Sequence, residues 1–139
     1  MPDTPITIQY AGDEFFIATP PSGHAIQIDV KSGRRAAPGP LELFIIGVGS
    51  CTAADVISIL HKKRENVTDY RVEIRTQRRD EHPRAFRRIE LKHILRGVQL
   101  STESVRRAIE LSTEKYCSAV ATVRATAEIV TSFEIEAEP

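Results

Sequence analysis

The amino-acid sequence predicts an α+β domain in which a largely antiparallel sheet packs against a central hydrophobic helix. Three observations support this prediction. Short alternating or β-rich runs, typical of strands, occur before residue 31, between residues 69 and 95, and after residue 125. One strongly apolar run, residues 43–54, is typical of a buried helix. The resulting order of elements, β-β-β-α-β-β-α-α-β, belongs to the α+β class.

The first thirty residues contain three predicted strands, at residues 6–10, 14–18 and 25–30. Two short segments that contain glycine or proline, residues 11–13 and 20–23, separate these strands. Strands this close in the sequence are typical of an antiparallel meander.

A loop and a long helix are predicted next. Residues 31–40 hold two glycines, two prolines and three cations, which indicates a loop. The helix is expected to run from Pro40 to about Arg64. Proline suits the first helical turn because its missing N–H would have no partner there, and Glu42 complements the positive end of the helix dipole.

The apolar part of this helix, residues 43–54, is about 12 residues long, whereas a membrane span needs roughly 20. We therefore expect a buried core helix and no membrane segment. A helix that is apolar on all sides needs cover on several faces, and one sheet of so small a chain covers a single face. A second copy of the chain could supply the remaining cover.

The second half of the chain contains two half-buried strands, at residues 69–77 and 86–95, in which polar and apolar side chains alternate. Ser101 is a suitable N-cap for a helix that runs to Tyr116, with Val105, Ala108, Ile109 and Ser112 on one face. A short helix at residues 117–124 and a strand at residues 126–135 complete the predicted domain.

The composition limits the function. A chain of 139 residues suits a single domain covering residues 1–139. Nineteen basic and nineteen acidic residues cancel, so no overall field favours nucleic acid or an anionic membrane. Two cysteines are too few for a disulfide-stabilised secreted scaffold, and no signal peptide is evident. We expect a cytoplasmic protein.

The two cysteines are the candidate catalytic residues. Cys51 lies in ELFIIGVGSCTAADV and Cys117 in ELSTEKYCSAV, which is 117 − 51 = 66 positions later. A peroxide-reducing cysteine needs a nearby cation, some access and a second thiol. Arg34 and Arg35, in the loop before the helix of Cys51, are candidate cations. The alternative is that both cysteines are small buried apolar residues and that the arginines are solvated.

Other site chemistry is not indicated. Four histidines stand at no ligand spacing, and two isolated cysteines do not form a zinc site. Glu42 lies nine positions before Cys51, about two and a half helical turns, so it could orient an arginine only from a kinked or pre-helical position.

The segments GPLELFIIGVGSCTAADVISILHKKR and RRAIELSTEKYCSAVA together resemble the OsmC/Ohr superfamily of osmotically induced and organic hydroperoxide resistance proteins. The resemblance extends over nearly the whole chain and is closer to the OsmC-like branch, because Glu42 stands one position later after the proline than in the hydroperoxide-resistance branch. It implies the OsmC-like fold and an intertwined homodimer, with each active site at the subunit interface.

The resemblance also implies roles for the cysteines. Cys51 would be the peroxidatic cysteine and Cys117 the resolving one, joined by an intramolecular disulfide after reaction with an organic hydroperoxide. A dithiol of the lipoyl type, or a small thiol, would reopen that disulfide. The chemistry needs no metal, haem or flavin. The residues that would activate Cys51 are Arg34, Arg35 and Glu42.

Two hypotheses follow from the sequence. The first is a thiol-dependent peroxidase that acts on organic hydroperoxides. The second is a non-catalytic OsmC-like dimer that binds a small apolar or thiol ligand, or senses redox state. A nucleic-acid-binding module is disfavoured because the chain is neutral and carries three tyrosines, five phenylalanines and no tryptophan for base stacking.

Overall fold

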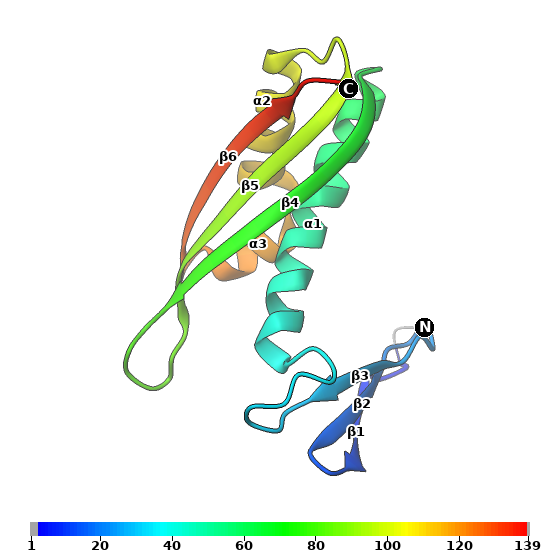
Figure 1. The fold of residues 1–139 in the computed structure, drawn as a ribbon, viewed down its shortest axis with the longest axis vertical. Coiled ribbons are helices and arrows are strands. Elements are labelled where there is room, and N and C mark those ends of the chain that lie inside the picture. The colour runs from blue at the N-terminus through cyan, green and yellow to red at the C-terminus, as the bar shows by residue number, and fades with distance from the viewer. Residues whose placement is uncertain (1–2, 139) are drawn as a thin grey trace. The chain divides into compact units, whose positions relative to one another are not determined.

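The structure, a computed structural model, describes residues 3–138. Its elements follow in the predicted order (Figure 1). They are β1 (Thr7–Gly12), β2 (Phe15–Thr19), β3 (Ile26–Asp29), α1 (Pro40–Lys62), β4 (Asn66–Arg78), β5 (Phe86–Val98), α2 (Thr102–Leu111), the π-helical turn η1 (Ser112–Tyr116), α3 (Ser118–Val123) and β6 (Glu128–Glu136).

The chain divides into two compact units, with the boundary between Ile46 and Gly47, inside helix α1. The N-terminal unit contains the sheet β1-β2-β3, whose neighbouring strands are antiparallel as the meander prediction required. Gly12 has a φ of +88°, which glycine adopts without strain, and the register of β1 shifts between Tyr10 and Gly12.

The C-terminal unit contains the sheet β4-β5-β6, and here one prediction needs correction. Strands β4 and β5 are antiparallel, but β6 pairs with β5 in parallel, from Arg88 opposite Glu128 to Arg96 opposite Glu136. The helical segment between β5 and β6 returns the chain to the end of the sheet where β5 began. Such a crossover is what a parallel neighbour requires.

One face of this sheet is covered by helices α1, α2 and α3 (Figure 1). The core joins α1, β5 and α2 through a cluster of buried side chains: Val56, Leu60, Leu95, Val105, Ala108 and Ile109. In β5 the predicted alternation is confirmed, because Ile89, Leu91, His93 and Leu95 are all fully buried.

Helix α1 is buried on one face only. Its buried residues follow a spacing of three to four: Val48, Gly49, Thr52, Val56 and Leu60. Leu41, Phe44 and Ile46 expose 43 to 54 % of their surface, so a single copy of the chain leaves part of this apolar helix uncovered, as the sequence led us to expect. By length and composition alone α1 could cross a membrane, although the core helix of a soluble protein meets the same criterion.

The helix that follows Ser101 has the predicted cap and an end that was not predicted. The Ser101 hydroxyl accepts the N–H of Ser104 at 3.1 Å, as an N-cap should. After Leu111 the helix widens into the π-helical turn η1, in which the N–H of Cys117 donates to the carbonyl of Ser112, five residues earlier, at 2.8 Å. The predicted single helix is therefore an α-helix followed by a π-turn.

Candidate functional site

The structure brings Cys51 and Cys117 together within the C-terminal unit. Cys51 is half-buried on α1, and Cys117, between η1 and α3, is only 3 % exposed. The two thiols lie near enough to interact, and each is a free cysteine. Two side chains that are 117 − 51 = 66 positions apart in the sequence thus form one thiol pair.

The surroundings of Cys117 fix its sulfur and keep it protonated. Its Sγ accepts the N–H of Val120 at 3.4 Å, at the start of α3, and its carbonyl accepts the N–H of Ala121 at 3.0 Å. Burial raises the pKa of the Cys117 thiol, and the neighbouring Cys51 thiol raises it further. Because only the thiolate is a strong nucleophile, this site disfavours Cys117 as the first thiol to react.

A buried hydroxyl network joins α1 to the segment that leads to Cys117. The Ser112 hydroxyl lies 2.8 Å from that of Thr52, and it donates to Oδ2 of Asp55 at 3.0 Å. Thr52 and Ser112 are fully buried. Thr52 directly follows Cys51, while the Ser112 carbonyl accepts the N–H of Cys117. The network therefore fixes the backbone next to both cysteines.

Sequence reasoning did not identify this network as part of the site. The signal was nevertheless present, because Ser112 stands on the otherwise apolar face of the predicted helix. A hydroxyl on a buried face needs a hydrogen-bond partner, which the sequence could not name.

Arg34, one of the predicted activating cations, is engaged within the N-terminal unit. Its Nε donates to Asp29 and its Nη1 to Asp13, both at 2.9 Å, and its Nη2 donates to the Asp13 carbonyl at 2.7 Å. The guanidinium also lies 3.8 Å from the centre of the Phe15 ring. Hydrogen bonding by Arg34, with the N–H groups of Ala36 and Lys31, holds the pKa of Asp29 well below its usual range.

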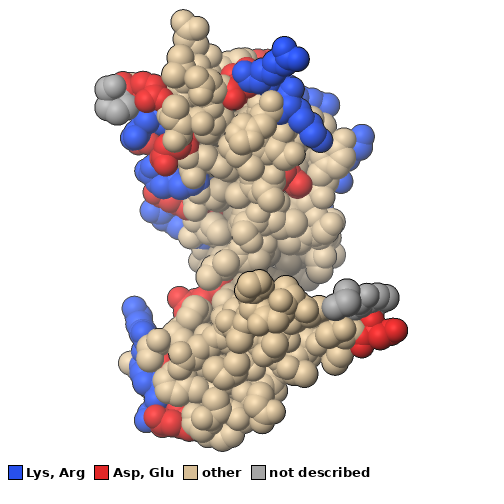
Figure 2. Space-filling view, turned by 90° about the vertical axis from the view of Figure 1, so that its right-hand side faces the viewer, with Lys and Arg blue, Asp and Glu red and all other residues tan. Residues whose placement is uncertain are grey.

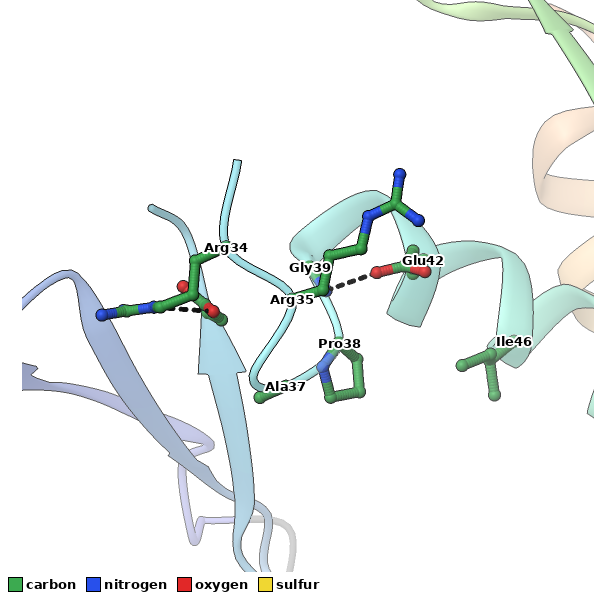
Figure 3. A pocket seen from close by; sticks show the side chains of 8 residues that line it. Arg34, Arg35, Ala37, Pro38, Gly39, Glu42 and Ile46 are labelled. Carbon is green, nitrogen blue, oxygen red and sulfur yellow. Dashed lines mark hydrogen bonds and ion pairs between the residues drawn. The ribbon is translucent and has the colours of Figure 1, made fainter. Parts of the chain in front are cut away.

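Arg35 and Glu42 line a cavity of about 610 Å³ in the same unit, together with Asp29, Arg34, Ala37, Pro38, Gly39 and Ile46. Figure 3 shows Arg34 directed toward strand β3 and Arg35 directed the opposite way, toward the first turn of α1. Oε1 of Glu42 accepts the N–H of Gly39 at 2.9 Å. Glu42 thus binds a backbone donor at the start of a continuous helix, as capping carboxylates do.

The predicted site residues therefore form two groups. Cys51 and Cys117 make the thiol pair, and Arg34, Arg35 and Glu42 border the cavity of the N-terminal unit. Arg35 has no hydrogen bond or ion pair with any other residue in the range 3–138. Over the same range, no group of three or more His, Cys, Asp or Glu side chains is arranged to hold a metal ion.

The sequence of this chain is similar to a described protein family and to individual known proteins. The sequence profile of the family described as "OsmC-like protein" matches residues 32–132. Protein YhfA of Escherichia coli strain K12 is 41 % identical over 122 residues, which covers 88 % of this chain and 90 % of that protein.

Solved structures share the fold. A hypothetical protein from Aquifex aeolicus is 30 % identical with a TM-score of 0.86, covering 97 % of each chain. An organic hydroperoxide resistance protein from Elizabethkingia anophelis is 15 % identical with a TM-score of 0.72, covering 96 % of this chain and 97 % of that one. At that identity the second likeness concerns the fold alone.

Proposed function

Because this chain belongs to the OsmC-like protein family, we propose that it is a thiol-dependent peroxidase that reduces organic hydroperoxides through Cys51 and Cys117. The observation that carries this proposal is the thiol pair itself. A half-buried cysteine on a rigid helix stands next to a second, buried thiol, and this is the arrangement that a two-cysteine peroxidase needs.

In the proposed reaction the Cys51 thiolate attacks one oxygen of the hydroperoxide ROOH. The O–O bond breaks, the alcohol ROH leaves after protonation, and Cys51 becomes a sulfenic acid. The Cys117 sulfur then attacks the Cys51 sulfur, which expels water and forms the disulfide. Two electrons have passed from the thiol pair to the hydroperoxide. A dithiol of the lipoyl type, or a small thiol, returns them.

The assignment of roles follows from exposure. Cys51 is the more accessible thiol, so a hydroperoxide would reach it first. Cys117 is buried and its pKa is raised, which suits a thiol that waits for the sulfenic acid on its neighbour. The proposed reaction requires no prosthetic group.

The cation that would activate Cys51 is a narrower proposal. The guanidinium of Arg34 is already satisfied by two aspartates, whereas that of Arg35 has no such partner among residues 3–138. We therefore favour Arg35 over Arg34 for this role. Glu42 binds the Gly39 N–H, which supports a helix-capping function beside any role in catalysis.

A homodimer is part of the proposal. Within the N-terminal unit, eight large apolar side chains expose between 38 and 64 % of their surface: Ile6, Ile8, Tyr10, Ile26, Val30, Leu41, Phe44 and Ile46. On the face drawn in Figure 2, the charged side chains of this unit gather at its margins around a broad uncharged area. Exposed apolar surface of this kind marks an interface, and a second copy of the chain is the expected occupant. We expect the dimer to act in the cytoplasm.

One observation favours a second candidate function. The cavity of about 610 Å³ combines Arg35 and Glu42 with the apolar side chains of Ala37, Pro38 and Ile46. Its volume lies in the range of small-molecule sites. A non-catalytic dimer that binds a small apolar or thiol ligand would need this cavity and would leave the thiols unreacted.

The deciding experiment mixes the reduced protein with cumene hydroperoxide and counts free thiols with time. The peroxidase proposal predicts rapid loss of both thiols in the wild-type protein and no such loss in Cys51→Ser. In Cys117→Ser, Cys51 should accumulate as a sulfenic acid that dimedone traps, detected on the Cys51 peptide by mass spectrometry. Thiols that stay unreacted in the wild-type protein would exclude catalysis and favour the ligand-binding dimer.

A further inference from the structure

A second, smaller cavity lies beside Cys117 in the C-terminal unit. It has a volume of about 220 Å³ and is bordered by Thr113, Glu114, Lys115, Cys117, Ala121 and Arg124. The volume is below the roughly 300 Å³ at which sites for drug-sized ligands begin, yet it is several times the roughly 30 Å³ that one water occupies. A small molecule, or the reactive end of a larger one, fits these dimensions.

The charges around this cavity favour an anion. Lys115 and Arg124 are two cations, and Glu114 is one carboxylate, so the border carries one net positive charge at neutral pH. Nη2 of Arg124 donates to the Thr113 carbonyl, and both residues border the cavity, so this hydrogen bond ties the guanidinium to the cavity wall. The remaining N–H groups of a guanidinium match a carboxylate in geometry as well as in charge.

We propose that this cavity admits a small thiol that carries a carboxylate, and that this thiol reopens the Cys51–Cys117 disulfide by attacking Cys117. The proposal rests on the peroxidase function, because it names the class of reductant that would complete the cycle. Cys117 itself is only 3 % exposed, and the cavity wall that it shares with Lys115 and Arg124 offers an approach to this otherwise buried residue.

Reduction of the Cys51–Cys117 disulfide consumes two molecules of the small thiol RSH. A thiolate RS⁻ attacks Sγ of Cys117 and forms an R–S–Sγ bond, while the Cys51–Cys117 bond breaks and its electron pair leaves on the Cys51 sulfur. A second thiolate attacks the R sulfur of this mixed disulfide. RSSR forms, and Cys117 leaves as a thiolate that takes up a proton. Two electrons pass from the two thiols to the protein disulfide.

The burial of Cys117 supports attack of the small thiol on Cys117 in preference to attack on Cys51. The pKa of Cys117 is raised, and a sulfur with a raised pKa is a poor leaving group in thiol–disulfide exchange. In the first step, attack on Cys117 with departure of Cys51 is therefore favoured over attack on Cys51 with departure of Cys117. The same property makes the departure of Cys117 in the second step the slower one.

The first test isolates the reductive step. The disulfide is formed with diamide, so no hydroperoxide is involved, and its opening is followed with 3-mercaptopropionate, 2-mercaptoethanol and cysteamine, which are anionic, neutral and cationic. Rates are compared per thiolate, after correction for the pKa of each thiol. We expect the anionic thiol to react about three- to tenfold faster than the cationic one at low salt, with the ratio falling as salt is added.

Substitutions then assign the preference to the cavity. Arg124→Gln and Lys115→Gln should each reduce the ratio, and Arg124→Glu should reverse it. Lys63→Gln, which removes an exposed cation outside the cavity, should leave it unchanged. Equal rates for the three thiols in the wild-type protein, or a ratio that the cavity variants do not alter, would overturn the proposal.

A second test does not depend on disulfide formation. In Cys51→Ser, Cys117 is the one remaining cysteine, and its modification by an anionic and a cationic methanethiosulfonate can be compared. Faster reaction with the anionic reagent, lost in Lys115→Gln, supports the anion preference even where the protein does not turn over hydroperoxide. If hydroperoxide leaves the thiols intact while this preference persists, the proposed function fails and the charge selectivity of the cavity stands. Faster reaction with the cationic reagent contradicts the cavity proposal itself.

Discussion

The hydroxyl of Ser112 lies 2.8 Å from the hydroxyl of Thr52, and this contact links the two segments that carry the cysteines. Thr52 directly follows Cys51 in the sequence, and the carbonyl of Ser112 accepts a hydrogen bond from the N–H of Cys117. Formation of a disulfide demands that two sulfurs meet within a narrow range of geometry. A rigid, buried hydrogen-bond network beside both residues is a physical means of holding them in that range.

Removal of the Ser112 hydroxyl tests whether the network stabilises the fold, positions the two cysteines for disulfide formation, or does both. In Ser112→Ala, Thr52 and Asp55 lose a buried partner, and we expect a loss of about 1–2 kcal/mol in the free energy of unfolding. Disulfide formation after peroxide treatment should also become slower. Urea unfolding and thiol counting measure the two effects. The control Ser58→Ala removes an exposed hydroxyl from α1, the helix that carries Thr52 and Asp55, and should change neither the stability nor the rate of disulfide formation. If the disulfide of Ser112→Ala forms at the wild-type rate, the network contributes to the stability of the fold and has no role in positioning the cysteines.

Replacement of Arg35 tests the activating cation. If this guanidinium lies near Cys51 and favours the reactive thiolate, Arg35→Gln should slow the peroxide-dependent loss of thiols about tenfold at neutral pH. Lys31→Gln removes another exposed cation of the same loop and should have little effect. An unchanged rate of thiol loss in Arg35→Gln would reject this role.

A charge on strand β1 should weaken the proposed dimer. Ile8 exposes 58 % of its surface, and a buried glutamate at this position would be costly at an apolar interface. We expect Ile8→Glu to lower the dimer fraction, measured by sedimentation velocity over a dilution series. Gln9→Glu places the same charge on the neighbouring residue, which points to the other face of the strand, and serves as the control. A wild-type protein that is monomeric throughout would contradict the dimer.

Two glycines of helix α1 should respond in opposite ways to alanine. A methyl group on Gly49 would collide with Cδ1 of Ile74 on β4, whereas a methyl on Gly47 meets no atom within 4 Å. The colliding atom is the end of a side chain that can rotate, so Gly49→Ala should destabilise the fold by no more than about 1 kcal/mol. Gly47→Ala should be neutral or stabilising by up to about 1 kcal/mol, because alanine favours helix. Adding Ile74→Val to Gly49→Ala should recover part of the loss; no recovery would reject the contact as its cause.

The buried His93 predicts loss of stability in mild acid. It is fully buried, its Nδ1 lies 2.7 Å from the Tyr70 hydroxyl, and burial lowers its pKa to about 4 from the usual 6.5. Below pH 6.5 this histidine is protonated in the unfolded chain, whereas in the folded chain it stays neutral down to about pH 4. The free energy of unfolding therefore decreases as the pH is lowered from 6.5 to about 4. The full effect is roughly 3 kcal/mol.

Denaturant unfolding at several pH values measures this effect. His93→Gln should flatten the dependence between pH 6.5 and about 4. His61→Gln, at an exposed histidine of α1, should retain it. A wild-type protein with constant stability across that window would show that His93 is protonated without penalty in the folded state.

Much of the fold followed from local patterns in the sequence. Alternation in β5 predicted which side chains are buried, and the N-cap at Ser101 was correct because capping depends on residues within one helical turn. The two cysteines were found because a thiol carries distinctive chemistry and its flanking residues resemble those of a family. These properties belong to short segments and can be determined from the sequence by itself.

The tertiary structure decided the rest. The parallel pairing of β6 with β5 depends on the path of a helical connection, and no pattern within a strand reveals the direction of its neighbour. Likewise, Ser112 became a partner of Thr52, and Arg34 a partner of Asp29, only when distant segments packed together. Alternation and spacing report which side of an element is buried, whereas the identity of the buried partner is a property of packing between elements.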